Sequence, residues 1–263
     1  MILGAVQGVT EFLPISSSGH LLLVPWAVGW DAPLLNSLTF AVAVHVGTGI
    51  AVFAALAGYW RELLTEALVS EGKGNGRSRL AAIVAGTAIV GIIALFAESA
   101  VESVLREPWI VAAALILAGA LLYAADRMAG PEDRASGAGF YAWLAVAISQ
   151  VVALIPGVSR SGITITTARF LGIGRVPAAV FSFQLMGPII LGAALWRGRE
   201  FVQSDPTGEE LALLAVAATV SAITGALAAR LLLRFLGRIG LGPFALYRGI
   251  VGVGALGLIL VRL

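Results

Sequence analysis

The sequence predicts an all-α integral membrane protein with six transmembrane helices and two re-entrant helical hairpins, arranged as an inverted-topology repeat. Three observations lead to this fold class: 59% of the 263 residues are hydrophobic, only 12% are charged, and the apolar residues gather in long runs. A soluble domain carries charge at about a quarter of its positions, and a core of this size could not bury so much apolar surface. Lipid must therefore be the solvent for most of the chain.

Six stretches are long and apolar enough to cross a bilayer. The hydrocarbon core is about 30 Å thick and needs about 20 apolar residues per helix. Charged or Gly/Pro-rich links separate the six stretches. They run over about 38 to 58, 80 to 97, 109 to 125, 177 to 196, 211 to 232 and 244 to 261.

Two further apolar stretches, about 1 to 30 and 139 to 171, are each interrupted by a Pro and a run of Ser and Gly. Exposed backbone amides and hydroxyls are too costly inside lipid, so these turns must lie within the protein at membrane depth. We expect each stretch to form a helix, a turn and a returning helix. Each would be a re-entrant hairpin.

The two interrupted stretches are related by an internal repeat. An offset of 143 residues superposes Gln7 on Gln150 and Ser16 on Ser159, and it places Ser17 opposite Arg160. We expect one membrane domain, 1–263, with repeat 1 over about 1–130 and repeat 2 over about 139–263. Three spans separate the hairpins, and an odd number inverts the second copy, so the two turns should meet near the midplane of the bilayer.

The basic residues of the loops predict the orientation. If each hairpin returns to the side from which it entered, eleven Arg and Lys residues fall on one side and four on the other. The positive-inside rule makes the first side cytoplasmic. We expect a multi-pass protein of the inner (plasma) membrane, with both termini on the outer side and a site open to the outer face. The first set is Arg61, Lys73, Arg77, Arg79, Arg127, Arg134, Arg169, Arg175, Arg230, Arg234 and Arg238; the second is Arg106, Arg197, Arg199 and Arg262.

The first turn combines a carboxylate with hydroxyls. Gln7 and Glu11 are four residues apart, so a helix places both on one face, pointing into the protein or into water. Pro14 ends that helix, and the Ser-Ser-Ser-Gly run that soon follows supplies hydroxyls and free backbone N–H groups that favour an anion. His20 follows three residues after Ser17, so it could reach that hydroxyl and act as a general base.

The second turn carries a lone guanidinium. Arg160 lies in an apolar run of more than thirty residues, where an unpaired charge costs several kcal/mol. Its planar fork suits phosphate oxygens, so Ser17 and Arg160 are expected to act as nucleophile and anion clamp on facing turns. The expected catalytic residues are Ser17, His20, Glu11 and Arg160, and the expected substrate-binding residues are Gln7, Ser16, Ser18, Gly19, Ser159, Ser161 and Gly162.

The segments from Gln7 to His20 and from Pro156 to Gly162 together closely resemble the BacA/UppP family of undecaprenyl-diphosphate phosphatases. The likeness extends to Tyr247-Arg248 and covers nearly the whole chain. It implies a membrane hydrolase that removes one phosphate from a polyprenyl diphosphate lipid, recycles the carrier of cell-wall synthesis and confers bacitracin tolerance. Family members need a divalent cation, usually Mg²⁺ or Ca²⁺, which the resemblance places at Glu11.

The resemblance also implies roles for individual residues. The chain departs from the family's pattern at one position. It implies that Ser17 is the nucleophile, His20 a candidate base and Arg160 the family's arginine. Many members carry Glu where this chain has Gln7, which leaves Glu11 as a single carboxylate. Direct attack by water, with Ser17 only as a ligand, remains open. His45 is read as part of interhelical packing and hydrogen bonding.

Other functions remain open. Inverted repeats with broken helices are the usual plan of transporters, so a lipid-phosphate transporter or flippase is the alternative. A passive channel lacks a recognisable filter. The chain has no cysteine, which excludes disulfides, thiolate catalysis and iron–sulfur clusters, and its net charge of +2 is too small for a nucleic-acid surface. The bilayer and the lipid are the expected partners, and assembly into a homodimer is left open.

Overall fold

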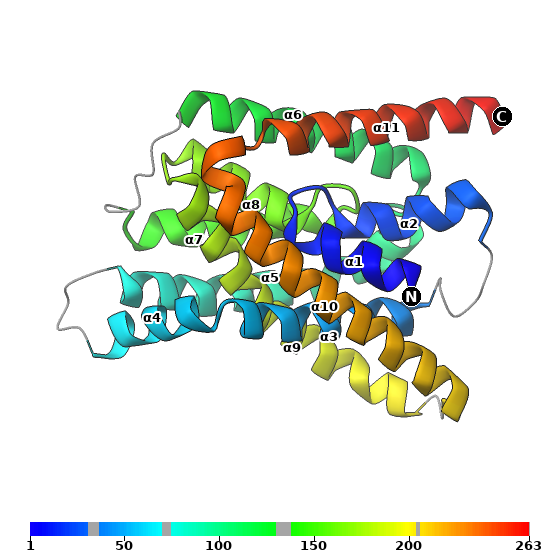
Figure 1. Cartoon of the computed structure of the whole chain (residues 1–263), viewed down its shortest axis with the longest axis horizontal. Coiled ribbons are helices and arrows are strands. Elements are labelled where there is room, and N and C mark those ends of the chain that lie inside the picture. The colour runs from blue at the N-terminus through cyan, green and yellow to red at the C-terminus, as the bar shows by residue number, and fades with distance from the viewer. Residues whose placement is uncertain (31–36, 70–74, 130–137, 204–205, 263) are drawn as a thin grey trace.

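The computed structural model describes residues 1–30, 37–69, 75–129, 138–203 and 206–262, and the regular elements of these ranges are helices. Both ends of the chain lie at one end of the molecule (Figure 1). In chain order the helices are α1 (Ile2–Phe12), α2 (Ser17–Val28), α3 (Leu38–Ala55), α4 (Ala57–Leu68), α5 (Gly76–Ser103), α6 (Pro108–Ala129), α7 (Phe140–Ile148), the 3₁₀ helix η1 (Ser149–Leu154), α8 (Arg160–Phe170), α9 (Arg175–Gln203), α10 (Gly208–Ile239) and α11 (Gly242–Arg262).

The all-helical membrane fold is confirmed. Within the described residues, α5, α6, α9, α10 and α11 each contain a stretch long and apolar enough to cross a bilayer. The expected span over 38–58 differs from a plain helix, because α3 ends at Ala55 and α4 leaves it at an angle of 67°. Arg61, Glu62 and Glu66 explain the bend, since lipid would not accept these charges on a straight continuation of α3.

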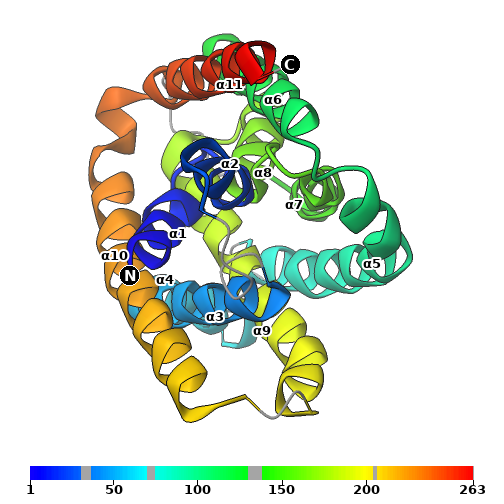
Figure 2. The ribbon, with the colours of Figure 1, turned by 90° about the vertical axis from the view of Figure 1, so that its right-hand side faces the viewer.

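The two interrupted segments lie in the interior of the molecule. Viewed from the end that carries the termini, α5, α6, α10 and α11 surround the α1–α2 pair and the α7–α8 pair (Figure 2). Each pair turns back within the protein, as the sequence predicts for re-entrant hairpins. This arrangement keeps the irregular backbone of both turns away from lipid, where its polar groups would lack partners.

Small residues allow α10 to approach the first hairpin closely. A side chain at Gly8 of α1 would collide with the backbone of Ser221 and the hydroxyl of Thr224, and one at Gly47 of α3 would collide with the carbonyl of Ala218. Helices in membranes gain most of their association energy from such close packing. The α1 helix is therefore held against a long spanning helix, which fixes the depth of the first turn.

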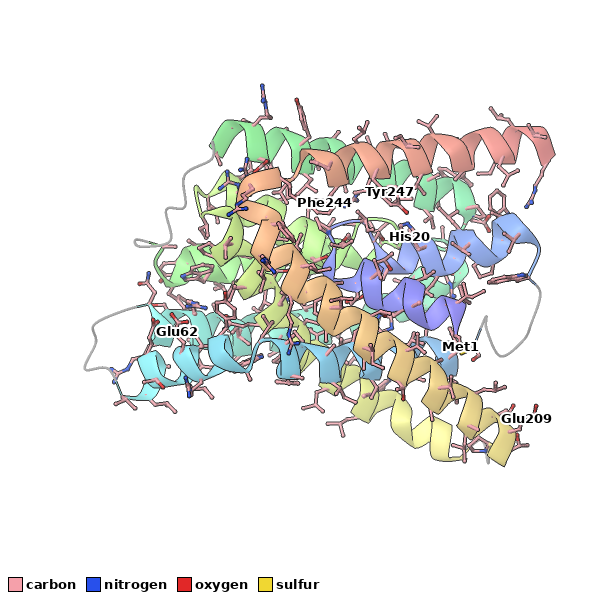
Figure 3. All side chains as sticks on the ribbon, in the orientation of Figure 1. Met1, His20, Glu62, Glu209, Phe244 and Tyr247 are labelled. Carbon is pink, nitrogen blue, oxygen red and sulfur yellow. The ribbon has the colours of Figure 1, made fainter. Side chains whose placement is uncertain are left out.

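Basic side chains gather at the end of the molecule opposite the termini. Met1 and Glu209 lie at one end, and Glu62 lies at the other (Figure 3). Lys73 and Arg134 fall outside the described residues, as do the side chains of Arg197 and Arg199. Figure 1 shows α4, the start of α5, the ends of α6 and α8, the start of α9 and the end of α10 on the Glu62 side. By their positions in the chain, these parts of the helices carry Arg61, Arg77, Arg79, Arg127, Arg169, Arg175, Arg230, Arg234 and Arg238.

A buried ion-pair cluster ties four helices together near this end. Asp126 of α6, which is 5% exposed, accepts hydrogen bonds from Arg169 Nε at 3.2 Å and from Arg175 Nε at 2.7 Å and Nη2 at 2.9 Å. Its second oxygen also accepts from the backbone amide of Leu241, between α10 and α11, at 3.1 Å. The carboxylate thereby links α6, α8 and α9 to the start of α11.

Replacing Asp126 with asparagine is expected to destabilise the protein by about 3 to 5 kcal/mol, because two cations then lose their shared buried carboxylate. The midpoint of thermal unfolding in detergent measures the effect. Glu209→Gln, at an exposed position on α10, is the matched control and should unfold like the wild type. An unchanged midpoint for Asp126→Asn would show that the cluster contributes no stability.

Candidate active site

The two turns have the same local geometry. Ser16 and Ser159 are the described non-glycine residues with positive φ, at 76° and 72°, and each is the N-cap of the returning helix. The side chain of each accepts a hydrogen bond from the amide three residues later, Gly19 at 3.2 Å and Gly162 at 3.1 Å. Residues related by the 143-residue offset therefore do the same structural work. How far each repeat extends, over 1–130 and 139–263, stays a prediction.

Hydrogen bonds join the two turns directly. The Ser161 hydroxyl, 1% exposed, lies 3.3 Å from the carbonyl oxygen of Glu11 and 3.2 Å from that of Leu13. Serine at this position therefore holds the second turn against the first. The expected meeting of the two turns inside the protein is what the structure shows.

A second link comes from the last helix. Arg248 of α11 is fully buried, and its guanidinium donates to the carbonyl of Pro14 at 3.2 Å in the first turn. It also donates to the carbonyls of Gly157 at 3.0 Å and Val158 at 2.8 Å in the second turn, and to that of Leu115 on α6 at 3.2 Å. One cation thus donates hydrogen bonds to carbonyls of both turns, where lipid could offer no donor.

The Glu11 carboxylate lies where the turns meet. Its Oε2 accepts a hydrogen bond from the Ser17 hydroxyl and another from Gln7 Nε2 at 3.1 Å. Its Oε1 accepts from Arg160 Nη2 at 3.1 Å. Glu11 is 6% exposed, so this buried carboxylate has both a compensating cation and hydrogen-bond donors. Ser17 and Arg160, far apart in the chain, are brought to one group.

The guanidinium of Arg160 is held from two sides. In addition to its ion pair with Glu11, its Nη1 donates to the carbonyl of Ser182 on α9 at 2.9 Å. The side chain is 13% exposed, and it is the first residue of α8, whose leading amides have no acceptor within their own helix. Positive charge from the side chain and from the helix start therefore coincide at this point.

His20 forms no hydrogen bond with Ser17, so the expected pairing of these two residues is wrong. Its Nδ1 lies 2.7 Å from the carbonyl of Ser16, which can only accept, so Nδ1 carries the proton. Its Nε2 lies 2.7 Å from the hydroxyl of Tyr247, which donates to it in that tautomer. The two rings also stack, with their centroids 5.6 Å apart. The Ser17 hydroxyl instead donates its hydrogen bond to Glu11 Oε2.

The remaining residues expected to bind substrate have different positions. Ser16, Ser159, Gly19 and Gly162 form the two caps, so their side chains and amides already have partners. Ser18 lines the large cavity described below, and its hydroxyl lies 3.3 Å from that of Ser16.

The surroundings of Glu11 do not fit a divalent cation. Three donors, Gln7, Ser17 and Arg160, already point hydrogens at its oxygens, and a guanidinium repels a second cation. The Gln7 side-chain oxygen is buried and receives no hydrogen bond from the described residues, but it is one neutral ligand. Within those residues, no three His, Asp or Glu side chains form a group able to hold a metal.

A cavity of about 1080 Å³ leads away from the junction of the turns. Ser18, His45 and Pro156 line its inner part, and Trp26 and Trp30, near the end of α2, line it farther along. Ten residues of helix span about 15 Å, so the cavity runs along α2 toward the end that carries the termini. Its walls, which include Leu21, Leu22, Phe40, Ile92, Leu95 and Ile189, are mainly apolar.

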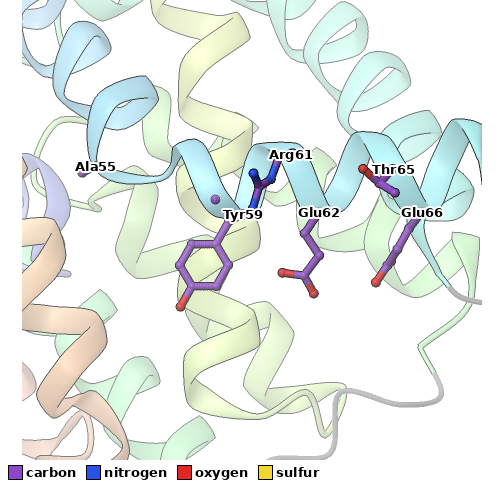
Figure 4. Close-up of a pocket in the computed structure, with 7 residues that line it drawn as sticks. Ala55, Tyr59, Arg61, Glu62, Thr65 and Glu66 are labelled. Carbon is purple, nitrogen blue, oxygen red and sulfur yellow. The ribbon is translucent and has the colours of Figure 1, made fainter.

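A second hollow, of about 550 Å³, lies along α4 (Figure 4). Tyr59, Arg61, Glu62, Thr65 and Glu66 line it, all from one helix. It is separate from both turns, and its polar lining consists mainly of surface side chains of α4, including two carboxylates and a guanidinium. The cavity beside Ser18 is therefore the better candidate for a lipid-binding site.

The sequence predicts no catalytic or binding role for three residues of this region. Arg248 and Tyr247 appeared only as part of the family likeness, and His45 was assigned to packing. An arginine inside the last apolar stretch was the available signal for Arg248, because a buried guanidinium needs several acceptors. His45 gave no signal in sequence, since its neighbourhood depends on how α3 meets α1.

Comparison with known proteins identifies the family of the chain. The family model described as bacitracin resistance protein BacA matches residues 1–254. Curated relatives named undecaprenyl-diphosphatase include those of Desulforudis audaxviator, 40% identical over 100% of this chain and 97% of its own, and Geobacter metallireducens, 41% identical over 97% and 95%. That of Geobacter sulfurreducens is 43% identical over 99% of this chain and 97% of its own. The chain belongs to the BacA family of membrane proteins.

Proposed function

We propose that the chain is an undecaprenyl-diphosphatase, a membrane hydrolase that removes the terminal phosphate of a polyprenyl diphosphate. The observation that carries the proposal is the junction of the turns, where the Ser17 hydroxyl and the Arg160 guanidinium share the Glu11 carboxylate. The apolar cavity beside Ser18 suits a prenyl chain. The relatives' shared name supports the same substrate class.

In the first step of the proposed reaction, Ser17 Oγ attacks the terminal phosphorus. The bond from that phosphorus to the bridging oxygen breaks, and the lipid monophosphate leaves. The Ser17 proton passes to Glu11, to which the hydroxyl already donates. Arg160 neutralises charge on the phosphoryl oxygens, because phosphoryl transfer depends mainly on positioning and electrostatic stabilisation.

In the second step, water attacks the seryl phosphate. The bond between the phosphorus and Ser17 Oγ breaks, inorganic phosphate leaves, and Oγ recovers its proton from Glu11.

His20 has a structural role in this proposal, since its ring bonds to the Ser16 carbonyl of the first turn and to the Tyr247 hydroxyl. Direct attack by water on the diphosphate is the competing mechanism.

The setting proposed for this reaction is the plasma membrane. The excess of arginine at the end opposite the termini favours a cytoplasmic location for that end, with both termini and the mouth of the cavity on the outer side. The product is the monophosphate form of the carrier lipid, so the role would be to recycle the carrier for peptidoglycan synthesis. Any divalent cation, Mg²⁺ or Ca²⁺, would enter with the diphosphate oxygens, since the Glu11 surroundings do not fit it.

Phosphate release by the detergent-solubilised protein tests the proposal. Undecaprenyl diphosphate should give equal amounts of lipid monophosphate and inorganic phosphate, because hydrolysis needs no sealed membrane. The same assay in the presence of a chelator, followed by addition of Mg²⁺ or Ca²⁺, reports whether phosphate release requires a divalent cation. A lipid-phosphate transporter would release no phosphate in detergent yet move the lipid across sealed vesicles, and that outcome would reject the enzyme assignment.

A further inference from the structure

His45 of α3 presents one ring nitrogen to the junction of the turns. Its Nδ1 lies 2.6 Å from the carbonyl of Ala41, which can only accept, so Nδ1 carries the proton. Its Nε2 lies 3.7 Å from Glu11 Oε2, the same oxygen that receives the Ser17 hydroxyl. In the neutral ring, Nε2 therefore carries a lone pair beside the proposed nucleophile.

His45 is also open to the cavity. Its side chain is 34% exposed, and it lines the cavity together with Ser18. The other histidine of the chain, His20, is 7% exposed, and Ser16 and Tyr247 occupy its two ring nitrogens. Of the two, His45 is the one whose second nitrogen a water molecule can reach.

The second step of the reaction needs a base that the first step does not supply. After the first step Glu11 holds the Ser17 proton, so it cannot take another from water. Water must attack the phosphorus from the side opposite Ser17 Oγ, as in-line displacement requires. The cavity lined by Ser18 and His45 becomes open to water once the lipid monophosphate has left it.

We propose that His45 is a further catalytic residue, the general base for hydrolysis of the seryl phosphate; the proposal rests on the function proposed above. The water oxygen bonds to phosphorus while one water proton passes to His45 Nε2. The bond from phosphorus to Ser17 Oγ breaks, and Oγ takes the proton held by Glu11. The His45 imidazolium then returns its proton to water in the cavity, and phosphate leaves.

The test separates the two steps with the full-length protein in detergent. Prenyl diphosphate carrying radiolabel in its terminal phosphate is mixed with protein, and the reaction is quenched in acid. The amount of lipid monophosphate is measured by chromatography, and the protein-bound label is counted. His45→Gln keeps a polar side chain that cannot take up a proton. It should release one equivalent of lipid monophosphate per protein at the wild-type rate, then retain the label on the protein, with steady-state turnover reduced by about 10²- to 10⁴-fold.

Controls distinguish failure of this proposal from failure of the proposed function. Ser17→Ala should give neither label nor monophosphate, and Ile50→Leu, on an exposed part of α3, should match the wild type. If the wild type itself releases no phosphate, the proposed function fails. If the wild type is active and His45→Gln turns over normally, slows the first release, or only raises KM, then His45 is not this base.

Chemical rescue provides a second measurement. If His45 had only a structural role, added imidazole would not restore dephosphorylation. His45→Ala opens space beside the cavity, so added imidazole should restore dephosphorylation of the labelled protein in proportion to its concentration. Imidazole should not affect Ser17→Ala. Failure of imidazole to release the label from His45→Ala, when the label is present, would overturn the proposal.

Discussion

Replacing Ser17 with alanine is expected to reduce phosphate release from a polyprenyl diphosphate by about 10⁴-fold or more, the scale seen when hydrolases lose a nucleophilic serine. The variant lacks the oxygen that forms the covalent intermediate, while Arg160 and the apolar cavity remain in place to bind the lipid. Lipid binding should therefore change little while kcat collapses. Steady-state phosphate release and direct lipid binding in detergent measure the two quantities.

Ser103→Ala is the matched control for the serine variant. Ser103 lies on an exposed part of α5, where its hydroxyl donates to the carbonyl of Ser99. Its removal should leave phosphate release unchanged. A near wild-type rate for Ser17→Ala would instead mean that water attacks the diphosphate directly.

Replacing Arg160 with alanine is expected to lower kcat/KM by about 10³- to 10⁵-fold, as for arginines that stabilise phosphoryl transfer in other enzymes. The change removes the charge that neutralises the phosphoryl oxygens and also leaves Glu11 without its ion-pair partner. Arg160→Lys keeps a charge but loses the planar fork, so its activity should lie between the two. Arg230→Ala, an exposed arginine of α10, is the control.

A double variant separates catalysis from stability at this position. Arg160→Ala alone leaves a buried carboxylate uncompensated, so the protein should unfold at a lower temperature. Adding Glu11→Gln removes that charge and should recover the unfolding midpoint without recovering activity. Recovery of both would mean that neither the Arg160 guanidinium nor the Glu11 carboxylate takes part in the reaction.

Much of the fold followed from the sequence because lipid imposes simple rules. Apolar length located the spans, and the interrupted stretches had to turn inside the protein because unpaired backbone groups are excluded from lipid. The bend between α3 and α4 was missed, although Arg61 and Glu62 near the end of the apolar stretch explain it. Hydropathy averaged over a window does not resolve where such a helix stops.

The sequence predicted that the two turns meet, but it predicted the contacts of individual side chains less well. The recurrence of Ser and Gly at a fixed offset brought Ser17 and Arg160 together correctly. Spacing along α2 suggested His20 as the partner of Ser17, but the ring folds back onto the preceding turn and meets Tyr247 from a helix more than two hundred residues away. Contacts between distant helices, His45 with Glu11 among them, are set by packing that one sequence does not reveal.

A structure of the protein with a polyprenyl methylenediphosphonate, which cannot be cleaved at the bridging position, tests the central claim most directly. We predict that the terminal phosphorus lies within about 3.5 Å of Ser17 Oγ, with the Arg160 guanidinium on its oxygens and the prenyl chain in the cavity along α2. A head group bound at the hollow along α4, or a structure in which Ser17 and Arg160 are far apart, would contradict the account.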